Sequence, residues 1–206
     1  MTLAIDASPG TAGLGAESVK ALAKHSPEHI YFTGRNTSAG NALISDVKAT
    51  NSSVTLTFIE MDMSSLDSVK KAVEKGFTHD RLDLLMCNAG IMATPPSLSK
   101  DGFESQFAVN HLAHAMILHV LTPVLVKTSE QPLSDVRVVT LTSLGWKAHP
   151  KEGIAFDQLR TTQESAIGGS WIRYGWVLPS ITPIFTSPPL LSSQVHPKFT
   201  IFQLRL

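Results

Sequence analysis

A glycine-rich turn near the start of the chain is the first group of residues that could do chemistry. Residues 8–15 read SPGTAGLG and stand between an apolar run, Leu3–Ala7, and a segment whose apolar residues recur at helical spacing. Glycines between a strand and a helix let the backbone approach a pyrophosphate, whose charge the helix N-terminus stabilises. The turn therefore predicts a dinucleotide site, and a plain tight loop is the alternative interpretation.

Arg35 indicates which dinucleotide such a site would take. It follows the second predicted strand, His29–Thr33, directly after Gly34. An acidic residue at this place would accept the ribose 2′-hydroxyl of NAD, whereas Gly34 and Arg35 suit a 2′-phosphate. NADP is therefore the expected cofactor, and a solvated loop charge is the alternative interpretation of Arg35.

Three other patterns resemble chemical sites but lack the partners that such sites need. His111, His114 and His119 fall on one predicted helix, but no fourth metal ligand is evident, so no metal is expected. Cys87 is expected to be a buried, inert strand residue. Ser97–Lys100 has a Ser-x-x-Lys spacing without the matching partner motifs, and a surface loop is expected there.

Apolar runs that alternate with helix-period segments predict the elements that position these residues. The pattern is typical of a parallel α/β sheet. Ser64, with Asp67 three residues on, predicts the start of the third helix. The predicted strands are Leu3–Ala7, His29–Thr33, 54–59, Leu82–Cys87, Val136–Leu141 and Phe199–Leu206, and the predicted helices are one that opens at Ala16 and those over about 39–49, 66–73 and 103–127.

Composition favours a neutral globular domain. The 206 residues are 43% hydrophobic and 17% charged, with a formal net charge of zero, which argues against a nucleic-acid partner. No uninterrupted apolar run is long enough for a membrane span, and no basic and apolar leader is present, so neither a span nor a secretory signal is expected. The single cysteine suits a reducing compartment, and a cytoplasmic location is expected.

The order of several motifs resembles the short-chain dehydrogenase/reductase family over roughly residues 1–175. The region after Asn88 is most similar to its retinol-dehydrogenase-like and fungal secondary-metabolism branches. The resemblance implies a Rossmann-like, doubly wound parallel sheet in three layers, incomplete at the C-terminus, and hydride transfer between NADP and a small carbonyl or alcohol. The motifs are SPGTAGLG, TGRN at 33–36, Asp62, CNAG at 87–90, Asn110 in VNHLAH, Ser143, and Tyr174 in RYG.

The resemblance also implies which residues hold the cofactor. The glycine-rich turn would line the pyrophosphate and the nicotinamide ribose, Asp62 would contact adenine, and residues 88–90 would pack along the adenosine ribose. The implied cofactor-binding residues are Gly10, Gly13, Leu14, Gly15, Arg35, Asp62, Asn88, Ala89, Gly90 and Tyr174.

Catalytic roles follow from the same resemblance. In the family a serine hydroxyl holds the substrate oxygen while a tyrosine phenol gives or takes its proton. These roles would belong to Ser143, at the end of the fifth strand, and to Tyr174, which follows Arg173, while Asn110 would support a proton-relay water. The alternatives are a strand-ending hydroxyl, a rim aromatic and a helix-bending polar residue, respectively.

Three positions depart from the family pattern. Pro9 replaces the first motif glycine, and because its φ is fixed we expect a shifted turn in which Gly10 compensates. Asp6 places a carboxylate within the first strand, where an unpaired charge is costly. The family's lysine, one helical turn after the tyrosine, is Leu178 here; its ammonium would lower the tyrosine pKa and hold the nicotinamide ribose.

The chain divides into a predicted NADP-binding domain, 1–175, and an atypical proline-rich tail, 176–206, with a final strand. The prolines of Pro179–Pro197 exclude a helix there. Two alternatives to an active enzyme follow: a catalytically inactive, cofactor-binding or scaffolding relative, and a tail that arises from a shifted reading frame or mis-splicing. No dimer is presumed, because the family often associates through the tyrosine-bearing helix.

Overall fold

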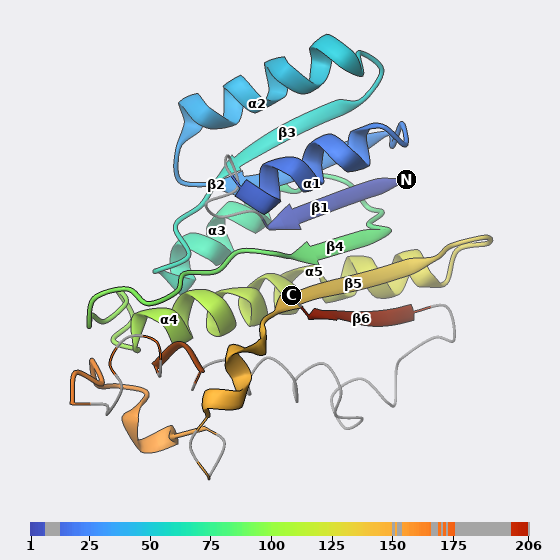
Figure 1. Cartoon of the computed structure of the whole chain (residues 1–206). Helices are drawn as coiled ribbons and strands as arrows, with labels where there is room; N and C mark the ends of the chain where they lie inside the picture. The colour runs from blue at the N-terminus through green and yellow to red at the C-terminus, as the bar shows by residue number, and fades with distance from the viewer. Residues whose placement is uncertain are drawn as a thin grey trace.

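Six parallel strands form one sheet in the computed structural model (Figure 1). The structure describes residues 1–6, 13–149, 151, 154–165, 169, 171, 173–175 and 199–205. The strand order is β3-β2-β1-β4-β5-β6, and every neighbouring pair is parallel. This is the predicted doubly wound sheet, including its sixth strand. The strands are β1 (Thr2–Asp6), β2 (His29–Gly34), β3 (Thr55–Glu60), β4 (Leu84–Cys87), β5 (Val136–Thr142) and β6 (Phe199–Arg205).

Helices cover both faces of this sheet and give three layers. Neighbouring residues of β2 point to opposite faces, so Ile30 and Phe32 pack under α1 and α2, while Tyr31 packs with α3 and α5. Each face therefore has its own apolar core. The helices are α1 (Gly13–Ala23), α2 (Thr37–Thr50), α3 (Leu66–Gly76), α4 (Ser105–Phe107) and α5 (Ala113–Ser129), with short 3-10 helices at Leu144–Ala148 and Phe156–Gln158 and helical residues 173–175.

The sheet reverses its winding between β1 and β4. Chain order runs outward from β1 through β2 to β3 in one direction, then returns to β4 on the other side of β1. In open α/β sheets of this kind, ligands bind outside the carboxyl ends of the strands at such a switch point. Leu14, which follows β1, and residues 88–92, which follow β4, lie at that edge and line one cavity there.

The long helix predicted over 103–127 is three pieces. After α4 the chain makes a π-helical turn, Ala108–Leu112, before α5 begins. A π turn inserts a residue into the helical ladder, which side-chain periodicity does not reveal. The stretch Ser105–Ser129 has the length and hydropathy of a membrane span, but core helices pass the same test, and Ile117, Leu121 and Leu125 pack in the core beneath α3.

Local capping differs from the prediction at α3. Ser65, not Ser64, is the N-cap, and its hydroxyl accepts a hydrogen bond from the Ser68 N–H at 3.3 Å. Ser64 instead donates its hydroxyl to Asp62 at 2.8 Å. Both serines could cap by residue type, so the choice depends on the path by which the chain leaves β3.

Candidate functional site

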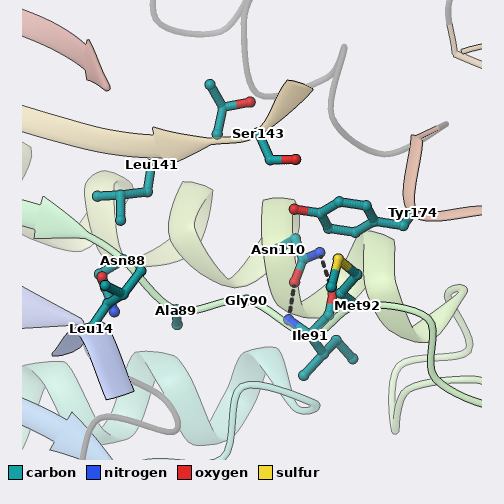
Figure 2. A pocket seen from close by; sticks show the side chains of 11 residues that line it. Leu14, Asn88, Ala89, Gly90, Ile91, Met92, Asn110, Leu141, Ser143 and Tyr174 are labelled. Carbon is teal, nitrogen blue, oxygen red and sulfur yellow. Dashed lines mark hydrogen bonds between the residues drawn. The ribbon is translucent and has the colours of Figure 1, made fainter. Parts of the chain in front are cut away.

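Ser143 and Tyr174 face one cavity of about 220 Å³ at the carboxyl ends of β4 and β5 (Figure 2). Ser143 comes directly after β5, and its Oγ accepts a hydrogen bond from the Gly145 N–H at 3.0 Å. The oxygen of Tyr174 points into the space on which Ser143 also opens. The other lining residues are Leu14, Asn88, Ala89, Gly90, Ile91, Met92, Asn110, Leu141 and Thr142.

Two polar atoms on the lining residues of this cavity lack a hydrogen-bond partner within the part of the chain that the structure describes. They are Oδ1 of Asn88 and Oγ1 of Thr142, both buried. Buried polar groups in folded proteins are nearly always paired, so these atoms fit a polar ligand in the cavity. A nicotinamide ribose offers hydroxyls of this kind, and the lining therefore suits the group that the sequence implies.

The glycine-rich turn is described only from Gly13 onward. Gly13 opens α1 with a φ of +61°, in the left-handed region that favours glycine. Leu14 is 60% exposed and lines the cavity, while Gly15 is buried. The predicted contributions of Pro9 and Gly10 lie outside the described residues, as do the side chain of Asp6 and residue Leu178.

Side chains from the broken helix hold the loop that follows β4. The Asn110 amide nitrogen donates to the Ile91 carbonyl, and its Oδ1 accepts from the Ile91 N–H, both at 2.8 Å. Gln106 Oε1 accepts from the N–H of Ala93 at 2.8 Å. The Asn110 carbonyl accepts from His114 Nδ1 at 2.9 Å. Asn110 thus fastens the loop on which the cavity depends, and its role toward a relay water stays a prediction.

Two further cavities continue from this one toward Arg35. A cavity of about 350 Å³ shares Gly90 and Ile91 with the first and is also lined by Arg35 and Asp62. The third, of about 490 Å³, shares Arg35 and Asp62 with the second and adds Glu60. Through these shared lining residues the three cavities neighbour one another at the carboxyl ends of the strands, and together they are called the path. Arg35 is exposed at its far end.

Asp62 lines the second and third cavities, and both oxygens of its ionised carboxylate accept hydrogen bonds. Its Oδ1 accepts from the N–H and hydroxyl of Ser64 at 2.9 and 2.8 Å, and its Oδ2 accepts from Lys100 Nζ at 2.8 Å. Burial acts to raise the pKa of Asp62, but these hydrogen bonds outweigh it and lower the pKa to about 2. Asp62 therefore ties the loop after β3 to the loop around residue 100.

His111 lies buried in the π turn, beside Asn110. Its ring packs against Phe107 with centroids 5.0 Å apart. Burial, with a smaller contribution from the charge of His114, lowers the pKa of His111 to about 4, so its imidazole is neutral near pH 7. Within the described ranges, no group of three His, Cys, Asp or Glu side chains could hold a metal ion.

Several cavity residues were not predicted from the sequence. Ile91, Met92 and Thr94 line the cavities through the loop after Gly90. Gln106 holds that loop while lining none of the three cavities. The loop follows the CNAG motif directly, and this position in the sequence could have identified its residues as candidates for lining the site. Cys87, expected as a buried strand residue, ends β4 and is 1% exposed.

Known proteins with similar sequences are short-chain dehydrogenases. The family model described as short chain dehydrogenase matches residues 9–148. The short-chain dehydrogenase/reductase drtF of Aspergillus calidoustus is 37% identical over 171 residues, which cover 81% of this chain and 52% of that protein. The chain spans about half the length of the curated relatives that it matches.

Solved structures share the fold at low sequence identity. A short chain dehydrogenase/reductase from Burkholderia phymatum in complex with NAD has a TM-score of 0.72 at 14% identity, over 99% of this chain and 64% of that one. A short-chain dehydrogenase from Sphingobium yanoikuyae in complex with NADPH has a TM-score of 0.70 at 17% identity, over 99% and 69%. Because the family model matches more than half of the sequence and the fold agrees, this chain belongs to the short-chain dehydrogenase/reductase family of oxidoreductases.

Proposed function

We propose that the chain binds NADP and transfers hydride between this cofactor and the carbonyl or alcohol group of a small molecule. One observation carries the proposal: three neighbouring cavities with shared lining residues extend from Ser143 and Tyr174 to Arg35. A path of this kind suits an extended dinucleotide, with its nicotinamide beside the two hydroxyls. A role in secondary-metabolite biosynthesis is part of the proposal, supported by the similarity to fungal members of the family.

Ser143 and Tyr174 would act on the substrate oxygen. The Gly145 N–H occupies one lone pair of Ser143 Oγ, which leaves the Ser143 hydrogen to donate to that oxygen. The phenol of Tyr174 opens on the same space and would give or take the proton. When bound, the nicotinamide would supply or accept the hydride.

Arg35 is the basis for NADP rather than NAD. Its guanidinium is exposed after β2 and can pair with a 2′-phosphate through two parallel hydrogen bonds. Glu60 lines the same cavity and accepts from the Thr37 hydroxyl at 2.9 Å, so a phosphate there would meet one cation and one anion. The two residues should therefore affect NADPH affinity in opposite directions.

A matched pair of variants tests this assignment. Arg35→Ala is expected to weaken NADPH binding at least tenfold, about 1.4 kcal/mol, and to leave NADH binding within twofold. Glu60→Gln removes the nearby anion and is expected to strengthen NADPH binding. Calorimetric titration of both variants with both cofactors measures this, and equal losses for NADPH and NADH in Arg35→Ala would remove the arginine from phosphate recognition.

A second candidate function is a relative that binds the cofactor without turnover. The observation in its favour is Leu178, which occupies the position of the family's lysine. Oxidation of NADPH with a panel of ketones and aldehydes separates the two candidates. Turnover that is lost in Tyr174→Phe but kept in Tyr31→Phe, which changes the other tyrosine of the chain, supports the enzyme. Saturable NADPH binding with no turnover above buffer supports the inactive relative.

A further inference from the structure

A buried ion pair lies next to Tyr174. Arg173 is 2% exposed and Glu104, which precedes α4, is 1% exposed. Arg173 Nε lies 3.9 Å from Glu104 Oε1, too far for a hydrogen bond but close enough for the charges to attract. Burial raises the pKa of Glu104, against the hydrogen bond from the Phe107 N–H and the charge of Arg173.

Each member of the pair also bonds to a different segment. Glu104 Oε2 accepts from the Phe107 N–H at 2.7 Å and so caps α4. Arg173 Nη2 donates to the Thr94 carbonyl at 2.6 Å. Thr94 belongs to the loop after β4 and lines the cavity that leads toward Arg35. The guanidinium therefore connects the segment that carries Tyr174 to a loop of the proposed cofactor path.

That loop is held from its other side as well. Asn110 bonds both polar backbone groups of Ile91, and Gln106 bonds the N–H of Ala93. Asn110 is 3% exposed and Gln106 is fully buried. Arg173, the neighbour of Tyr174 in the sequence, supplies the next contact along the loop, at Thr94.

Stability alone is a weak reason to keep such a pair. Moving a guanidinium and a carboxylate out of water is costly, and apolar residues of similar size often replace a buried pair without loss. A long contact between Nε and Oε1 returns little of that cost. A fixed position for the adjacent residue is a different benefit, because the hydrogen bond from Arg173 to the Thr94 carbonyl has a preferred direction that apolar contacts lack.

The geometry points to Arg173 and Glu104 as positioning residues that hold the phenol of Tyr174 at the end of the proposed cofactor path. Their effect on proton transfer rests on the proposed function. The position of Tyr174 in the protein without any ligand does not, so it can be measured separately.

The chain has two tyrosines, Tyr31 and Tyr174, so the position of Tyr174 can be followed directly. Protein labelled with ¹³C at Cζ of the tyrosines gives one signal from each, and Tyr31→Phe assigns them. Arg173→Met alone would leave the Glu104 carboxylate buried without a cation, so Arg173→Met/Glu104→Gln is the main variant. We expect its Tyr174 signal to move by more than its line width toward the position of free tyrosine.

Two controls separate positioning from a general loss of stability. Arg81→Met/Asp83→Asn removes another ion pair, in which Arg81 Nη2 and Asp83 Oδ1 lie 2.6 Å apart. This pair lies at the amino end of β4, whereas the cavity lies at its carboxyl end. The variant should lower the melting temperature and leave the Tyr174 signal in place. Arg173→Lys keeps a cation and a donor for the Thr94 carbonyl. Its Tyr174 signal should therefore lie closer to the wild-type position than that of the double variant.

Turnover gives the second readout where the wild type is active. The double variant should lose at least tenfold in kcat, with the KM for NADPH within twofold. A folded double variant whose Tyr174 signal stays within its line width of the wild type would overturn the inference. If the wild type binds neither NADPH nor NADH, the proposed function fails, while the Tyr174 signal still decides the role of Arg173.

Discussion

Acid should destabilise this protein through His111, and the structure gives the size of the effect. The imidazole is 7% exposed and packs against Phe107 in the π turn. Its pKa is lowered from 6.5 to about 4, whereas the unfolded chain binds a proton near pH 6.5. As pH falls between these values the unfolded state gains a proton that the folded state excludes, so stability falls. Each pKa unit is worth about 1.4 kcal/mol, which gives a loss of about 3 kcal/mol.

The variant His111→Gln removes the titrating group while keeping a side chain of similar size. Its free energy of unfolding should therefore fall less than that of the wild type between about pH 7 and about pH 4, by about 3 kcal/mol. Urea denaturation followed by circular dichroism at several pH values measures both. Glu104, whose raised pKa gives a dependence of opposite sign, is present in both proteins and cancels in the difference.

His119→Gln is the matched control, because His119 is exposed on α5, the helix that follows the π turn. Its pH profile should follow that of the wild type. Superimposable profiles for His111→Gln and the wild type would show that the buried imidazole takes up its proton as readily as the unfolded chain does. The reasoning from burial would then be refuted.

Two further predictions concern the loops and the packing around the sheet. Lys100→Met should raise the pKa of Asp62 above about 2, which carboxyl NMR measures. A lowered carboxyl pKa stabilises the fold above about pH 4, and this stabilisation is lost as the pH falls through about 2. Above about pH 4 the variant should therefore have a free energy of unfolding lower by about 1 kcal/mol, a figure reduced to allow for the partial exposure of the two side chains. An unchanged Asp62 titration would contradict this. Gly40→Ala should lower the free energy of unfolding by about 1–2 kcal/mol, because the added Cβ would lie 2.6 Å from the Phe58 ring. Thermal unfolding measures the loss, and Phe58→Leu should reduce it.

The strands and the ends that carry the site could be predicted because each has a local signal. Apolar runs that end at Gly34, Cys87 and Thr142 put the following polar residues at one edge of a parallel sheet. The family resemblance singled out Ser143 and Tyr174, and in the structure both line one cavity. β4 begins at Leu84 rather than Leu82, and the Leu82 N–H donates to the Thr128 hydroxyl of α5 instead of to a neighbouring strand.

Features that depend on distant residues could not be predicted. No local feature of the sequence marks the π turn, and its consequence is the placement of Asn110 against Ile91. Arg173 and Glu104 stand far apart in the sequence, and nothing local marks either as a partner of the other. Lys100 likewise reaches Asp62 only through the folded path of its loop.

Binding of the cofactor to the full chain tests the central claim most directly. Calorimetric titration should give one NADPH site per chain, with an affinity at least tenfold higher than that for NADH, a difference of about 1.4 kcal/mol. That result would agree with a path that ends at Arg35. Absence of saturable binding for both nucleotides would contradict the account.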